Sequence, residues 1–209
     1  RRQRQMCIRD SPGIVAVFVL LNFAVRAVLA TLETLSINIM SYLITGSTNP
    51  KDWARSDALW LTSTVFFVLG LVGLLMFAFL YCAEPYIQDR VLLLAGLATT
   101  LVGIFVMCDF HDGRGLPREI GLVRFEVGLG IAWAVGYPIT QTVVVSALSK
   151  VLTKEQQGLW MGNLASAGSA GRIVAPILAG VVYTQTRSHT GLIPLLACAG
   201  VTLGALLLI

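Results

Sequence analysis

Three ionisable residues, Arg26, Glu33 and Arg172, stand inside long apolar runs of this 209-residue chain. Arg172 lies in ASAGSAGRIVAPILAG, residues 165–180, where almost every neighbour is small or apolar. An ionised side chain in a nonpolar medium is stable only beside water, a counter-charge or an anionic ligand. These residues therefore offer two kinds of chemistry: the two arginines can bind an anion, and Glu33 can exchange a proton.

No enzymatic motif accompanies these charges. The chain contains no HExxH pair, no GxSxG turn and no phosphate-binding loop, and Gly128-Leu-Gly130 lacks the third glycine of a dinucleotide fingerprint. The four cysteines form no CxxC or Cys/His cluster, so neither a metal site nor a disulfide framework is indicated. We expect a protein with no cofactor, no metal and no catalytic activity.

The composition indicates a membrane protein. Hydrophobic residues make up 56% of the chain and charged residues only 12%, whereas a typical soluble domain is about a quarter charged. The basic residues are scattered through connecting segments and form no basic face with interleaved aromatic residues. Nucleic acid is therefore excluded as a partner, and the lipid bilayer is expected as the surroundings.

Long apolar stretches between polar connectors predict six transmembrane helices, and hence an all-α membrane bundle. The chain begins with Arg and ends within an apolar run, so we expect a fragment, with residues 1–13 as a leader and 14–209 as one six-helix unit. The opening RRQRQMCIRDS is typical of translated adapter sequence or of a basic cytosolic linker, and no functional role is assigned to it. The six predicted spans are 14–42, 57–81, 91–108, 120–148, 159–184 and 191–209.

The depth of each charge follows from its position in its span. At 1.5 Å per residue, Arg172 lies ~20 Å and Arg26 ~18 Å from the start of their helices, which is near the bilayer centre. We expect Arg172 to face the bundle interior. Glu33 follows Arg26 by seven residues and shares its helical face, and Arg124 lies at a depth like that of Glu33. An ion pair between Glu33 and Arg124 is therefore predicted, although each charge can also serve only to join helices or reach the interface.

Small residues and prolines suggest how the helices pack. Gly168 and Gly171 would let a neighbouring helix approach Arg172 closely and enclose it within protein. Pro138 and Pro176 lie inside helical runs, where each removes a backbone hydrogen bond and tends to kink the helix. Glycines four residues apart are expected to pack tightly as well: Gly158 with Gly162, and Gly200 with Gly204.

The segment QGLWMGNLASAGSAGRIVAPILAGVVY, residues 157–183, resembles the eleventh helix of major facilitator superfamily proteins. Together with the NF pair at 22–23 and LET at 32–34, it is similar to the lysosomal ceroid-lipofuscinosis group of that superfamily. The resemblance covers essentially the whole chain as a carboxyl-terminal half, so that the six spans are helices seven to twelve and the first span leaves the cytosol. It implies an amino-terminal six-helix half as partner, a site between the halves and alternating access.

The resemblance also bears on individual residues. It places the first and fourth spans beside the central cavity, which makes Arg26 and Glu33 its strongest candidates for binding a solute. Asp89 and Arg90 match the loop signature Gly-x-x-x-Asp-Arg-x-Gly-Arg of the family, whereas its glycine positions hold Pro85 and Leu92. A lysosomal or other endomembrane location is implied as well.

These observations predict a secondary transporter for a small anionic or mixed-charge solute, bound by Arg26, Glu33 and Arg172. Its energy would come from a gradient of the solute, of protons or of another ion, because the chain has no motif for ATP hydrolysis. Two alternatives use the same residues. One is an anion channel, in which buried arginines attract the ion without a transport cycle. The other is a membrane scaffold or receptor, in which the charges only hold helices together.

Overall fold

The computed structural model describes residues 12–47, 51, 57–83, 86–109, 117–186 and 191–209. In these ranges the chain forms helices and no strand. Residues 1–11 of the predicted leader lie outside the described residues, whereas residues 12 and 13 already belong to the first helix. The elements are α2 (Pro12–Thr45), α4 (Ala58–Ala83), α5 (Asp89–Met107), α6 (Arg118–Leu129), η1 (Gly130–Gly136), α7 (Tyr137–Val151), α8 (Lys154–Thr186) and α9 (Leu192–Leu207).

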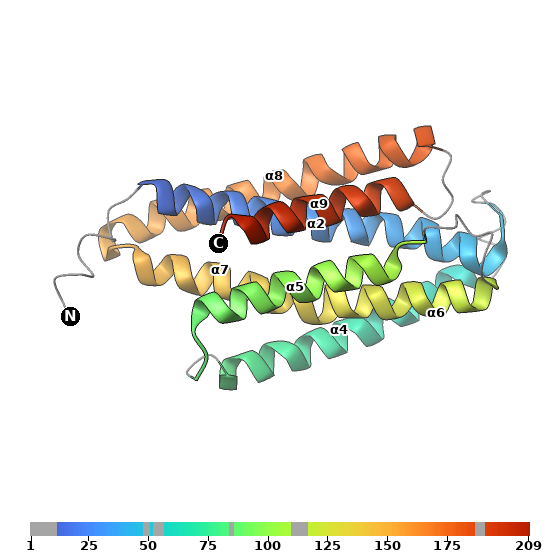
Figure 1. The fold of residues 1–209 in the computed structure, drawn as a ribbon, viewed down its shortest axis with the longest axis horizontal. Helices are drawn as coiled ribbons and strands as arrows, with labels where there is room; N and C mark the ends of the chain where they lie inside the picture. The colour runs from blue at the N-terminus through green and yellow to red at the C-terminus, as the bar shows by residue number, and fades with distance from the viewer. Residues whose placement is uncertain (1–11, 48–50, 52–56, 84–85, 110–116, 187–190) are drawn as a thin grey trace.

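The helices lie side by side along the long axis of the molecule (Figure 1). In this view α2, α8 and α9 form the upper part of the bundle, and α4, α5 and α6 the lower part. The closest association is between α2 and α8, which are far apart in sequence. The second large contact surface joins α5 to the run formed by α6, η1 and α7.

Five helical segments of the described chain are long and apolar enough to cross a membrane. They correspond to the first five predicted spans, and the fourth of them, Glu119–Val151, includes α6, η1 and α7. The sixth predicted span, 191–209, corresponds to α9, a shorter apolar helix of 16 residues. At 1.5 Å per residue α9 is about 24 Å long, which is less than the hydrocarbon core of about 30 Å.

Glycines mark the ends of two helices. Gly46 has a φ of 71° directly after α2, and its N–H donates to the Tyr42 carbonyl over 2.7 Å. Gly191 has a φ of 65° directly before α9. Only glycine adopts such left-handed conformations without steric cost, so both turns depend on the residue type.

The helices enclose two apolar clusters, one toward each end of the bundle. The first contains Leu32, Met40 and Ile104, all almost fully buried between α2 and α5. The second cluster contains Leu97 of α5 and Val144 of α7, both almost fully buried. By contrast, large apolar side chains remain exposed on the outer helices: Trp60, Phe67, Leu75 and Phe79 on α4, and Ile173, Ile177 and Leu178 on α8. An apolar exterior of this extent suits contact with lipid.

Two of the glycines predicted to pack tightly do so. A Cβ atom at Gly168 would lie 2.7 Å from the Asn22 amide nitrogen, and one at Gly171 would lie 2.7 Å from the Phe23 carbonyl oxygen. The expectation was wrong for Gly158, Gly162, Gly200 and Gly204, because no described atom would lie within 4 Å of a Cβ there. A four-residue spacing permits close approach, but it does not place a helix there.

The two prolines differ in their effect on the helix. Pro138 follows η1, a π-helical turn, and occupies the start of α7, so the helix changes its hydrogen-bonding pattern just before this residue. Pro176 lies inside α8, which continues as one helix to Thr186. Missing hydrogen bonds at proline are tolerated in membrane helices when neighbouring groups replace them.

We predict that Gly171→Ala lowers the melting temperature of the purified protein, because the methyl group would meet the α2 backbone. Overpacking costs about 1–3 kcal/mol, against a gain of up to about 1 kcal/mol in helix propensity. Gly70→Ala on α4 is the matched control, since a Cβ there meets nothing within 4 Å, and it should leave the melting temperature unchanged or raise it. Equal shifts for the two variants would contradict the close α2–α8 approach.

Candidate solute-binding site

The Glu33 carboxylate joins three membrane segments. Its Oε2 lies 3.3 Å from an Arg172 guanidinium nitrogen on α8. Its Oε1 accepts a hydrogen bond of 3.1 Å from the indole N–H of Trp133 on η1. Both carboxylate oxygens are therefore engaged, and α2, η1 and α8 meet at one side chain. Sequence reasoning named Glu33 and Arg172, but it did not identify Trp133.

This group lies on an accessible face of the described helices. The Arg172 side chain is 48% exposed and the Glu33 side chain 32% exposed. The expectation that Arg172 faces the interior of this bundle was therefore wrong. Both charged side chains are therefore accessible from this face of the described helices.

Arg26 lies seven residues before Glu33, about two helical turns away on the same face of α2. Its Nε is buried and has no hydrogen-bond partner among the described residues. The side chain packs against Gly168 of α8, where a Cβ would lie 2.9 Å from Nε. The Tyr137 hydroxyl lies within electrostatic range of Arg26, Arg172 and Glu33. An unsatisfied buried cationic donor is costly, so this position is suited to an anionic or hydrogen-bond-accepting group.

Two buried amides extend the group. Gln141 of α7 donates from Nε2 to the Asn22 Oδ1 over 3.3 Å, and Asn22 donates from Nδ2 to the Leu164 carbonyl of α8 over 2.6 Å. Asn22 is 1% and Gln141 9% exposed. The Gln141 Oε1 at the end of this chain has no described partner. The amides connect α2, α7 and α8 through the apolar interior.

Sequence reasoning missed these amides, although their spacing is a signal that could have found them. Asn22 precedes Arg26 by four residues and so shares its helical face, and Gln141 follows Tyr137 by the same interval. A polar side chain in a membrane span is energetically unfavourable, so one that shares a helical face with a charged residue is itself a candidate for a solute-binding site. We call the following set the polar column: Asn22, Arg26, Glu33, Trp133, Tyr137, Gln141 and Arg172.

The predicted ion pair between Glu33 and Arg124 was wrong. Arg124 instead lies 3.4 Å from Asp109, the residue just beyond the end of α5. Asp109 is 8% exposed, so this pair is more enclosed than the pair of Glu33 with Arg172. Equal depth in the membrane made the pairing of Glu33 with Arg124 plausible, but the rotation of α6 turns Arg124 toward α5.

The Asp89–Arg90 pair of the loop signature connects helix ends. Asp89, in the first turn of α5, accepts two hydrogen bonds of 2.9 and 3.0 Å from the Lys150 ammonium in the last turn of α7. Arg90 donates to the Ile209 carbonyl over 3.1 Å. An anion at a helix start and a cation at a helix end also suit the helix dipoles. Pro85, at a glycine position of the signature, lies outside the described residues.

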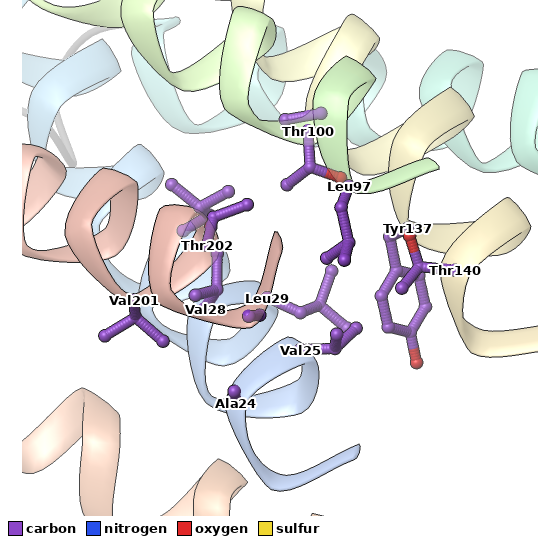
Figure 2. A pocket seen from close by; sticks show the side chains of 13 residues that line it. Ala24, Val25, Val28, Leu29, Leu97, Thr100, Tyr137, Thr140, Val201 and Thr202 are labelled. Carbon is purple, nitrogen blue, oxygen red and sulfur yellow. The ribbon is translucent and has the colours of Figure 1, made fainter. Parts of the chain in front are cut away.

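A small cavity lies beside the polar column, between α2, α5, α7 and α9 (Figure 2). Its volume is about 20 Å³, room for about one water molecule. Three threonines line it, Thr100, Thr140 and Thr202, and each donates its hydroxyl to the carbonyl four residues earlier in the chain. Figure 2 shows the Tyr137 ring at the edge of the cavity with its hydroxyl directed away from Thr100. The cavity is too small for a solute.

No group of three potential metal ligands from His, Cys, Asp and Glu was found in the part of the chain that the structure describes. The polar column itself contains a single carboxylate and no His or Cys. Its chemistry is that of paired and unpaired charges between membrane helices.

The fold and the polar column together describe a multi-pass integral membrane protein with charged groups positioned between its helices. The chain is 25% identical over 231 aligned residues to major facilitator superfamily domain-containing protein 8 of Xenopus laevis, an alignment that covers 90% of this chain and 43% of that relative. The resemblance to the major facilitator superfamily is confirmed, and the chain spans less than half the length of this relative. No protein-family model and no solved structure matches the chain.

We predict that Asn22→Leu destabilises the protein by about 0.6–1.7 kcal/mol, which are the average and the maximum measured for hydrogen bonds between membrane helices. The loss should exceed that of Thr99→Val, whose hydroxyl only bonds its own helix. Because Asn22→Leu leaves Gln141 buried without a partner, adding Gln141→Leu should cost less than the two single changes together. Thermal unfolding of the four variants measures this, and strict additivity would contradict the amide chain.

Proposed function

We propose that this chain is half of a secondary active transporter that moves a small anionic or mixed-charge solute across the membrane by alternating access. The observation that favours this function most is the polar column, which has one accessible ion pair and one buried arginine Nε without a partner among the described residues. The similarity to a major facilitator superfamily protein supports it. A second six-helix half would complete the site.

In this proposal Arg26 and Arg172 bind the anionic part of the solute. The solute competes with Glu33 for Arg172, whose side chain is half-exposed and therefore accessible to it. Glu33, once released, is free to take up a proton, which would couple the solute to a proton gradient. Asp109 is another carboxylate near a span, but it is paired with Arg124 beyond the end of α5.

The two alternatives make different predictions for flux. An anion channel on the same scaffold would conduct without saturating and without exchange against solute on the opposite side. A scaffold or receptor would move no solute at all. Similarity to the ceroid-lipofuscinosis group supports a lysosomal or other endomembrane location for this proposal, and imaging of a tagged full-length protein would test it.

We predict that Arg172→Gln lowers uptake per folded molecule roughly ten- to hundredfold, because a hydrogen bond to a charged group contributes about 1.5–3 kcal/mol. Arg172→Lys keeps the charge but loses the planar fork, so it should have a smaller effect. Uptake of a labelled organic anion, identified in a screen of the complete protein, would be divided by the amount of folded protein in each sample.

Arg124→Gln is the matched control for this measurement, since Arg124 also lies in a membrane segment but pairs with Asp109. It should reduce the amount of folded protein while leaving uptake per folded molecule unchanged. If both Arg172 variants also keep normal uptake per folded molecule, Arg172 has no direct part in transport.

We also predict that these 209 residues alone do not transport, because a site between two halves cannot form from one half. The purified chain would be reconstituted in liposomes beside the complete protein, and solute uptake would be followed over a range of concentrations. Saturable flux through the 209-residue chain would contradict the proposed arrangement.

A further inference from the structure

The indole that contacts Glu33 belongs to an unusual part of the fold. Trp133 lies in η1, the seven-residue π-helical segment between α6 and α7. π-helical turns are rare and occur mostly as local bulges inside α-helices, often at functional sites. The packing of the fourth span indicates what this turn achieves.

One side of the fourth span packs on α5 through small residues at intervals of four: Gly128, Ala132, Gly136 and Thr140. A Cβ at Gly128 would lie 2.7 Å from the Gly103 carbonyl, and one at Gly136 would lie 2.8 Å from the Thr100 nitrogen. In a regular α-helix of 3.6 residues per turn, such positions drift by about 40° at each step. The wider π turn offsets part of this drift and keeps the small residues against α5.

The same turn determines where Trp133 points. With the small residues held against α5, the indole N–H reaches Glu33 Oε1 on α2 over 3.1 Å. The ring also packs edge-to-face against Phe66 of α4, with centroids 6.1 Å apart and planes at 86°. Trp133 is therefore fixed by its ring on one helix and by its N–H on another.

The hydrogen bond from Trp133 complements the ion pair from Arg172. The indole can only donate, and it engages the carboxylate oxygen that Arg172 leaves free. When a solute anion takes Arg172, the Glu33 carboxylate keeps this second attachment and does not follow the arginine. We infer that Trp133 is a positioning residue, which holds the Glu33 carboxylate beside Arg172 and retains it on α2 while the arginine is engaged elsewhere.

The role of the Trp133–Glu33 hydrogen bond in transport rests on the proposed function, but the hydrogen bond itself can be tested without transport. The titratable and charged groups around Glu33 are Arg172 from α8, Tyr137 from α7 and Arg26 on α2 itself. Arg124 on α6 is paired with Asp109, and Cys198 on α9 faces Thr31. Protonation of Glu33 is therefore the event that should change the surroundings of the indole most directly.

The test is the fluorescence of Trp133 in the complete protein, purified in detergent, with the other three tryptophans of this chain and any elsewhere in the protein replaced by Phe. We expect the emission maximum to shift to shorter wavelength as the pH falls through the titration of Glu33, because the indole loses its anionic partner. Glu33→Gln should remove this titration and fix the emission at its low-pH position. The replaced tryptophans of this chain are Trp53, Trp60 and Trp160.

Two control variants separate this hydrogen bond from general effects of the fold. Glu126→Gln removes a carboxyl group from the same span as Trp133 and should leave the titration intact. Phe66→Leu removes the ring contact but not the indole N–H, so the titration should persist in it as well. An emission that does not titrate while the protein is folded, or that titrates identically in Glu33→Gln, would overturn the inference.

The variant Trp133→Phe tests whether the hydrogen bond to Glu33 affects transport. It removes the donor and keeps an aromatic ring, so we expect folded protein in normal amounts and uptake per folded molecule reduced, but by less than in Arg172→Gln. Unchanged uptake in Trp133→Phe would overturn the positioning role even where the fluorescence titrates. A complete protein that moves no solute would instead refute the proposed function, and the titration would still decide whether Trp133 holds Glu33.

Discussion

The rest of this structure depends on the high cost of an ionised side chain inside a bilayer. Arg26, Glu33 and Arg172 lie in apolar membrane helices, and each interacts with groups from other helices. Lipid cannot solvate a guanidinium or a carboxylate, so protein groups must do so. The close pairing of α2 with α8 and the position of the fourth span supply those groups.

Close approach of helix backbones makes this possible. Gly168 and Gly171 bring α8 so near to α2 that Asn22 reaches the Leu164 carbonyl and Arg26 packs on the α8 backbone. Lipid offers no hydrophobic force to drive helices together, so such packing and the hydrogen bonds it permits have to hold the pair. Small residues and polar residues therefore act together where α2 meets α8.

The fourth span meets two requirements at once. Its small residues pack on α5, and its aromatic and polar side chains, Trp133, Tyr137 and Gln141, serve the polar column. A strictly regular helix would rotate one of these faces out of register over several turns. The π-helical turn before Pro138 lets both faces keep their neighbours, which explains an irregular element in an otherwise regular bundle.

The sequence alone determined the class of protein, the positions of the spans and the residues that are costly in lipid, because apolar length and buried charge are local properties. It correctly indicated Gly168 and Gly171 as packing positions, and Arg172, Glu33 and Arg26 as unusual charges. Only the tertiary structure decided which side chains interact: Glu33 with Arg172 and Trp133, and Arg124 with Asp109. The physical reason is that pairing depends on the rotation and register of each helix about its axis. These are decided by packing over the whole bundle and, in the fourth span, by a π turn that no local pattern revealed.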